Sequence, residues 1–244
     1  MTPAIRPLAL AACAALSTLA LPLASARAQD KPGLDIVGFN GRGFFYGIEQ
    51  YGLRPRTRTP YSEIHIYDLR TGEEIHRSPF IYDLKEKIPE GVSTKQAIRR
   101  ARDEVYFDAK RVIRYLTLVP RGKTFTPADE KARKAMFIAA PGLSGALELK
   151  TFPLSTPRCP GVKTMGYTLM MKTDKGEKLI HKTSKLPGDL GCPVDYELAS
   201  ANVYMPVPDL NALAVVLAAR QGGKDAGDVR YTATGRLFDN RKKK

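Results

Sequence analysis

Two carboxylates are the residues of this sequence best suited to acid and base catalysis. Glu49 ends a predicted aromatic strand, and Glu63 begins the strand that follows the turn at Pro60. If both faced one cleft beside Tyr51 and Tyr61, one carboxyl group could donate a proton while the other activated water, as in glycoside hydrolysis. One hypothesis is therefore that the protein is a hydrolase that uses the Glu49 and Glu63 pair.

A structural role competes with this hypothesis and is the stronger expectation. The loop between the two carboxylates is basic, with Arg54, Arg56 and Arg58 in close succession. Glu49 and Glu63 would then bind loop amides or pair with these arginines. Neither the catalytic nor the structural role of the two carboxylates requires a bound metal or cofactor.

Other catalytic patterns are incomplete. Residues 117–124 end in Gly-Lys-Thr, but Thr117 stands where a phosphate-binding loop has its first glycine. Ser144 lacks the second glycine of a Gly-x-Ser-x-Gly turn. The histidines His65, His76 and His181 have no further ligand at a spacing typical of zinc sites. We therefore expect no metal and no cofactor, and the sequence favours a non-enzymatic protein over an enzyme.

The excess of basic residues is the broadest functional signal. The chain has 39 Lys and Arg against 25 Asp and Glu, which gives a net charge of +14. A cationic surface attracts anionic lipid headgroups, lipopolysaccharide and wall polymers without specificity. No nucleic-acid-binding module is recognisable, so no specific nucleic acid is expected, and no protein partner is indicated. The competing interpretation is that the charge only keeps the protein soluble.

Antiparallel hairpins dominate the elements that would position these residues. Strands 35–39 and 43–51 are joined by Asn40-Gly41, a strong hairpin signal. Strand 62–69 alternates apolar and polar side chains, which predicts one buried and one solvent face. The other expected strands are 74–79, 165–172, 177–183, 145–151, 195–204, 211–219 and 229–238.

One long amphipathic helix is predicted over 94–116. Ser93 and Gln96 form a capping box in front of an apolar stripe that includes Ile98, Val105 and Val112. Its basic face consists of Arg99, Arg100, Lys110, Arg111 and Arg114. A second, short helix is predicted from Thr126-Pro127 to about Phe137. The expected fold class is α+β and β-rich, with one or two sheets.

The first 28 residues are typical of a secretory signal peptide. Arg6 precedes an apolar stretch, and Ala28 ends a small-residue cleavage site; Ala26 is a second possible site, and Cys13 offers a lipoprotein alternative. Cleavage after Ala28 removes two arginines and no acid, so the net charge falls from +14 to +12. We expect a periplasmic or secreted protein with a single β-rich domain over 29–240, a basic tail at 241–244 and no membrane-spanning segment after cleavage.

The exported chain keeps two cysteines, Cys159 and Cys192. In an oxidising compartment such a pair forms a disulfide more often than it remains as two free thiols.

Several short motifs along the chain form a pattern. The opening motifs are Gly38-Phe39, Phe44-Phe45, Glu49-Gln50-Tyr51-Gly52, Pro60-Tyr61-Ser62-Glu63-Ile64 and Asp68. Later ones are Gly191-Cys192-Pro193 with Tyr196, and strand 212–219 followed by Arg230-Tyr231. Together they resemble a bacterial family of predicted secreted proteins, the domain of unknown function 2259. The similarity covers most of 36–238, but the first turn reads Phe39-Asn40-Gly41-Arg42 where the family has Ser-x-Asp-Gly. The resemblance implies an envelope or secreted setting and a disulfide, and it assigns no activity.

Overall fold

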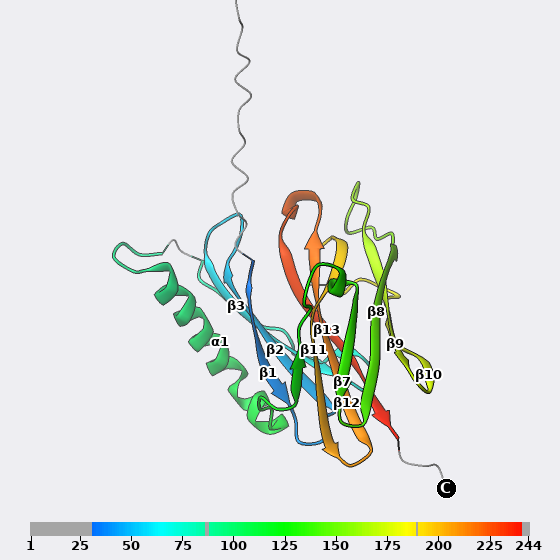
Figure 1. The fold of residues 1–244 in the computed structure, drawn as a ribbon. Coiled ribbons are helices and arrows are strands. Elements are labelled where there is room, and N and C mark those ends of the chain that lie inside the picture. The colour runs from blue at the N-terminus through cyan, green and yellow to red at the C-terminus, as the bar shows by residue number, and fades with distance from the viewer. Residues whose placement is uncertain (1–30, 86–87, 189, 241–244) are drawn as a thin grey trace, which may run out of the picture.

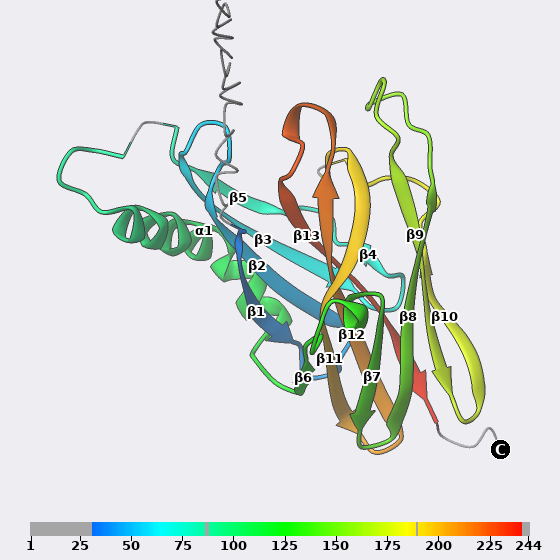
Figure 2. The same ribbon diagram turned by 45° about the horizontal axis from the view of Figure 1, so that its top comes forward.

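Within the described residues of the computed structural model, three antiparallel sheets and one long helix stack as four layers (Figure 1). The structure describes residues 31–85, 88–188 and 190–240, so the expected signal peptide and the C-terminal tail lie outside the described residues. The order of the layers is helix α1, sheet A, sheet B and sheet C, as the turned view in Figure 2 also shows.

Each sheet is built largely from neighbours in the chain. Sheet A has the order β1-β2-β3-β4, with β5 also paired to β3. Its strands are β1 (Gly33–Phe39), β2 (Phe45–Leu53), β3 (Pro60–Asp68), β4 (Glu73–Glu74) and β5 (Phe80–Asp83). Sheet B has the order β13-β12-β11-β6. Its strands are β6 (Lys123–Phe125), β11 (Pro193–Val207), β12 (Leu210–Gln221) and β13 (Val229–Asp239). Sheet C has the order β10-β9-β8-β7. Its strands are β7 (Ala135–Ala140), β8 (Leu143–Pro153), β9 (Met165–Thr173) and β10 (Gly176–Lys182).

Strand β12 is buried on both faces, which explains its continuous apolar sequence. Alternate side chains point to opposite faces of a strand. Leu213, Val215 and Leu217 therefore join the core shared with sheet C. Ala214 and Val216 join the core shared with sheet A. Sheet B is consequently the central layer against which both other sheets pack.

Helix α1 (Thr94–Leu116) covers the other face of sheet A. Its capping box is present as the sequence predicts: the Ser93 hydroxyl accepts from the Gln96 amide, and the Gln96 side chain accepts from the Ser93 amide. Val105 is fully buried against sheet A, whereas Ile98 and Val112 are only half-buried. The most buried helix positions are mainly alanines, which lets the helix lie close to the sheet; they are Ala97, Ala101, Val105 and Ala109.

The β-rich fold class, the hairpin at Asn40-Gly41 and the long helix are confirmed, with three corrections. There are three sheets in the described residues, not one or two. The short helix predicted over 126–137 is wrong. Met136 and Ile138 are buried and Phe137 is exposed, the alternation of a strand, and only a 3₁₀ turn forms at Lys131–Arg133.

The strand expected over 74–79 is also wrong as a continuous element. Only β4 pairs there, and β5 starts at Phe80. Pro79 has no amide hydrogen to donate to a sheet. The Ser78 hydroxyl instead accepts from the Ile66 amide at 2.9 Å, in place of a backbone partner.

The disulfide expected from the sequence joins Cys159 to Cys192, with a sequence separation of 33. We predict that the Cys159→Ser/Cys192→Ser double variant loses about 4 kcal/mol of unfolding free energy in urea, because a crosslink across such a loop restricts the unfolded chain. A reducing agent should lower the stability of the wild type to that of the double variant and leave the double variant unchanged. Equal stability of the oxidised wild type and the variant would contradict this.

Candidate functional site

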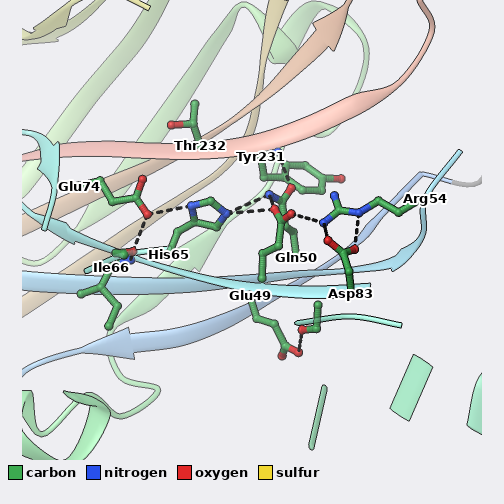
Figure 3. A network of polar contacts seen from close by, with 12 residues as sticks. Glu49, Gln50, Arg54, His65, Ile66, Glu74, Asp83, Tyr231 and Thr232 are labelled. Atoms are coloured by element: carbon green, nitrogen blue, oxygen red, sulfur yellow. Dashed lines mark hydrogen bonds and ion pairs between the residues drawn. The ribbon is translucent and has the colours of Figure 1, made fainter. Parts of the chain in front are cut away.

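Sheet A separates the two carboxylates that the sequence placed in one cleft. In the β2–β3 register, Glu49 pairs with Ile64 and Gln50 pairs with Glu63. Since neighbouring side chains along a strand point to opposite faces, Glu49 faces helix α1 and Glu63 faces sheet B. Figure 3 shows Glu49 on the opposite side of the strands from Gln50 and His65.

The Glu49 carboxylate, which is completely buried, binds an arginine from helix α1. Arg102 donates from Nε to Oε1 at 2.8 Å and from Nη2 to Oε2 at 2.7 Å. The same guanidinium pairs with Asp35 at 2.5 Å and lies 3.9 Å from the centre of the Tyr51 ring. The Ser62 hydroxyl donates to Oε1 at 2.8 Å. This set of contacts satisfies Glu49 and attaches the helix to β1, β2 and β3.

The Glu63 carboxylate lies on the other face and binds a different arginine. Arg54 donates to Glu63 Oε1 at 2.5 Å, pairs with Asp83 at 2.7 Å and lies 3.8 Å from the centre of the Tyr61 ring. The Gln50 amide donates to Glu63 Oε2 at 2.6 Å, and its own oxygen accepts from the Tyr231 amide of β13 at 2.9 Å. Each carboxylate therefore has its own arginine and its own tyrosine.

His65 extends this second set of contacts into a buried polar chain. Its Nε2 lies 3.0 Å from Gln50 Nε2 and 3.4 Å from Glu63 Oε2, and its Nδ1 lies 2.9 Å from Glu74 Oε1. This buried polar chain of side chains reaches a cavity at each of its two ends. Glu74 lines a cavity of about 370 Å³, and Arg54 lines one of about 300 Å³.

The ionisable groups of this chain stabilise each other's charges. Burial opposes ionisation of Glu63, but the hydrogen bond to His65 and the charge of Arg54 outweigh it and lower the pKa to about 2. Burial likewise opposes protonation of His65, but its contacts with Glu63 and Glu74 outweigh it and raise the pKa to about 9. The contacts with Glu63 and Glu74 therefore favour the protonated form of the imidazole.

The hypothesis of a common Glu49 and Glu63 cleft is wrong, because a strand layer lies between the two groups. The alternative expectation was right for Glu63, which pairs with Arg54, and it missed the partner of Glu49. A signal for that partner is present: Arg102 lies four residues after Ile98 and three before Val105, so it interrupts the apolar stripe of the helix.

Helix α1 exposes its basic face to solvent. The five basic residues that the sequence assigns to this face are all exposed: Arg99, Arg100, Lys110, Arg111 and Arg114. Among the described residues, only Arg99 of these five has an ion-pair partner, Asp103 at 4.0 Å. Two large aromatic side chains lie on the same helix, Phe107 at 72% exposure and Tyr115 at 85%. Exposed aromatic rings next to unpaired cations are typical of contact surfaces.

A metal-binding cluster and a membrane-spanning helix are both absent from the described residues. No three His, Cys, Asp or Glu side chains in this part of the chain are grouped so that they could hold a metal ion. No helix there is long and apolar enough to cross a lipid bilayer.

The Arg102 contact predicts a large effect of a single substitution. Arg102→Met leaves the carboxylate of Glu49 buried without its cation, and we expect a loss of about 3–5 kcal/mol in unfolding free energy in urea. The matched control is Arg99→Met, whose side chain is 84% exposed, with a loss below about 1 kcal/mol. Adding Glu49→Gln to Arg102→Met should restore part of the stability. Equal effects of Arg102→Met and Arg99→Met would be evidence against a structural role for the pair.

The raised pKa of His65 predicts that the unfolding free energy of the protein falls at alkaline pH. Its folded-state pKa of about 9 exceeds the usual 6.5, so its stabilising contribution is complete below pH 6.5 and is lost as the pH rises through 9. We expect the unfolding free energy of the wild type to fall by up to about 3 kcal/mol across this window, measured in urea. His65→Gln should abolish the fall and the exposed-site control His76→Gln should keep it; a wild type with constant stability over this range would refute the assignment.

The comparisons with known proteins agree with the resemblance in the sequence motifs. No curated protein and no solved structure matches the chain. The family model described as "Predicted secreted protein (DUF2259)" matches residues 47–236, which contain both carboxylates, helix α1 and the disulfide. The chain therefore belongs to this family of predicted secreted proteins.

Proposed function

We propose that this protein is an exported, non-enzymatic binding protein that attaches to anionic surfaces of the bacterial envelope through helix α1. The observation that carries the proposal is the outward face of the helix, where the exposed cations surround Phe107. The leader peptide of the sequence provides the route to the periplasm or the exterior.

Electrostatic attraction would supply most of the binding energy. A Lys or Arg close to an anionic membrane contributes about 1 kcal/mol, and the contribution decreases as salt screens it. The four basic side chains without ion-pair partners in the described part of the chain, Arg100, Lys110, Arg111 and Arg114, can engage phosphate groups without breaking an existing contact. The acidic residues of the helix, Asp103, Glu104 and Asp108, reduce the net charge without removing the basic excess.

The exposed aromatic rings favour lipids over wall polymers as the anionic partner. Phe107 and Tyr115 are too exposed to contribute to the core of this protein. Aromatic side chains are favoured at membrane interfaces, where the ring contacts acyl chains while nearby cations contact headgroups. Anionic lipids, including lipopolysaccharide, offer both environments.

The test is co-sedimentation of the purified exported protein with anionic and with zwitterionic vesicles across a salt series. We expect binding to anionic vesicles only, which weakens as salt rises. Arg100→Glu/Arg111→Glu/Arg114→Glu should reduce the affinity by at least about tenfold. The matched control, Lys150→Glu/Lys163→Glu/Lys175→Glu, changes the net charge equally on exposed positions outside the helix and should retain binding.

Three results would overturn the proposal: no binding at low salt, binding that is indifferent to salt, or equal losses in the two triple variants. A parallel experiment with isolated wall sacculi identifies the anionic partner. Phe107→Ser/Tyr115→Ser should weaken vesicle binding and leave any sacculus binding unchanged, because only the lipid surface has an apolar layer for the rings.

A further inference from the structure

The cavity that Glu74 lines lies where three sheet edges meet. Its walls come from β4 of sheet A, β13 of sheet B and β10 of sheet C, and residues 183–188 close one side. Contacts between the walls hold them in place: the Thr234 hydroxyl donates to the Gly72 carbonyl at 3.4 Å, and Arg236 donates to the Leu179 carbonyl at 2.6 Å. The volume of about 370 Å³ is sufficient for a small organic molecule.

The buried polar chain ends at the cavity with the carboxylate of Glu74. With His65 protonated, the chain consists of five charges of alternating sign: Asp83, Arg54, Glu63, His65 and Glu74. The sum of these charges is negative, and the terminal group at the cavity is the Glu74 carboxylate. Glu74 therefore presents a negative charge at the cavity wall, and Asp83, which is 39% exposed, is the carboxylate at the other end of the chain.

Half of the Glu74 carboxylate is available to a ligand. Oε1 accepts from both His65 Nδ1 and the Ser78 hydroxyl. Within the described residues Oε2 has no hydrogen bond, and Figure 3 shows it turned away from His65. The neighbouring Glu73 is exposed at the same wall and makes no side-chain hydrogen bond in the described structure.

The other walls provide aromatic and neutral polar groups. Tyr67 and Tyr231 line the cavity, and the Tyr67 hydroxyl lies 3.4 Å from that of Thr232. Burial lowers the pKa of His181, so this lining residue adds no positive charge at neutral pH. Lys185 is a cation at the rim and is exposed. Tyrosine rings beside carboxylates are the combination that stabilises an organic ammonium group.

We propose that this cavity binds a small organic cation, with its ammonium group at Glu74 Oε2 and Glu73 and its carbon skeleton against Tyr67 and Tyr231. The site is separate from the basic face of helix α1, which lies on the opposite face of sheet A. The cation-binding proposal therefore does not depend on the proposal that helix α1 binds the envelope.

Isothermal titration calorimetry with charged probes and neutral counterparts tests the ligand class. The pairs are choline with 3,3-dimethylbutan-1-ol, putrescine with butane-1,4-diol, and glucosamine with N-acetylglucosamine. We expect at least one cation to bind with a Kd below about 1 mM and its neutral counterpart to bind at least about tenfold more weakly. If no cation of the panel binds, or if both members of every pair bind equally, the proposal is overturned.

Variants of the cavity wall locate the binding. Glu73→Gln removes an exposed charge outside the buried chain, so the fold should persist while the affinity for the cation falls about tenfold. Lys185→Gln is the matched control at the rim and should keep or increase the affinity, because it removes a repelling charge. Glu74→Gln should abolish binding, with thermal unfolding as the check on folding. Unchanged affinity in Glu73→Gln and in a folded Glu74→Gln would place the binding elsewhere and contradict the proposal.

Discussion

The ion pair between Arg102 and the buried Glu49 determines how helix α1 lies on the protein. A buried carboxylate is tolerated only with a cation and hydrogen-bond donors, and Arg102 supplies most of them. Because Arg102 must point at the sheet, the rotation of the helix about its axis is set. The positions opposite Arg102 then face solvent, and these include Phe107 and the cations around it. The surface that we assign to envelope binding is therefore a consequence of a contact on the hidden side of the helix.

Sheet B gives the remaining layers their positions. The central strand β12 presents Ala214 and Val216 to sheet A and larger leucines to sheet C. The small side chains allow sheet A to approach closely enough for the Tyr231 amide of β13 to reach Gln50. This contact orients the amide of Gln50 toward Glu63 and His65. Packing of apolar residues in one strand thus determines the geometry of the buried polar chain and of the cavity in which it ends.

Local signals in the sequence predicted the elements well. Asn40-Gly41 and the Ser93 capping box act within a few residues, and the corresponding hairpin and helix are present. The disulfide followed from the count of cysteines in an exported chain. Failures arose where distant segments decide the outcome. The region 126–137 contains helix-compatible residues, but pairing with β8 makes 135–140 a strand.

The site shows the same limit of local reasoning. The alternation in β3 predicts one buried and one solvent face, yet Glu63 and His65 are buried because sheet B covers the second face. Nothing in the sequence around β3 indicates that layer, which comes mainly from residues 193–239. The separation of Glu49 from Glu63 depends on the exact strand register, and a shift of one residue would have reversed it.

The central claim, that the outward face of helix α1 is the membrane contact, is tested most directly by a local environmental probe. Cys159 and Cys192 form the disulfide, so in protein produced from residue 29 onward an added thiol can be labelled selectively. A polarity-sensitive fluorophore at Asp103→Cys, on the exposed face of the helix, should shift to the blue on addition of anionic vesicles. The same fluorophore at Lys175→Cys, in the β9–β10 turn, should not respond. A shift at Lys175→Cys with none at Asp103→Cys would contradict the account.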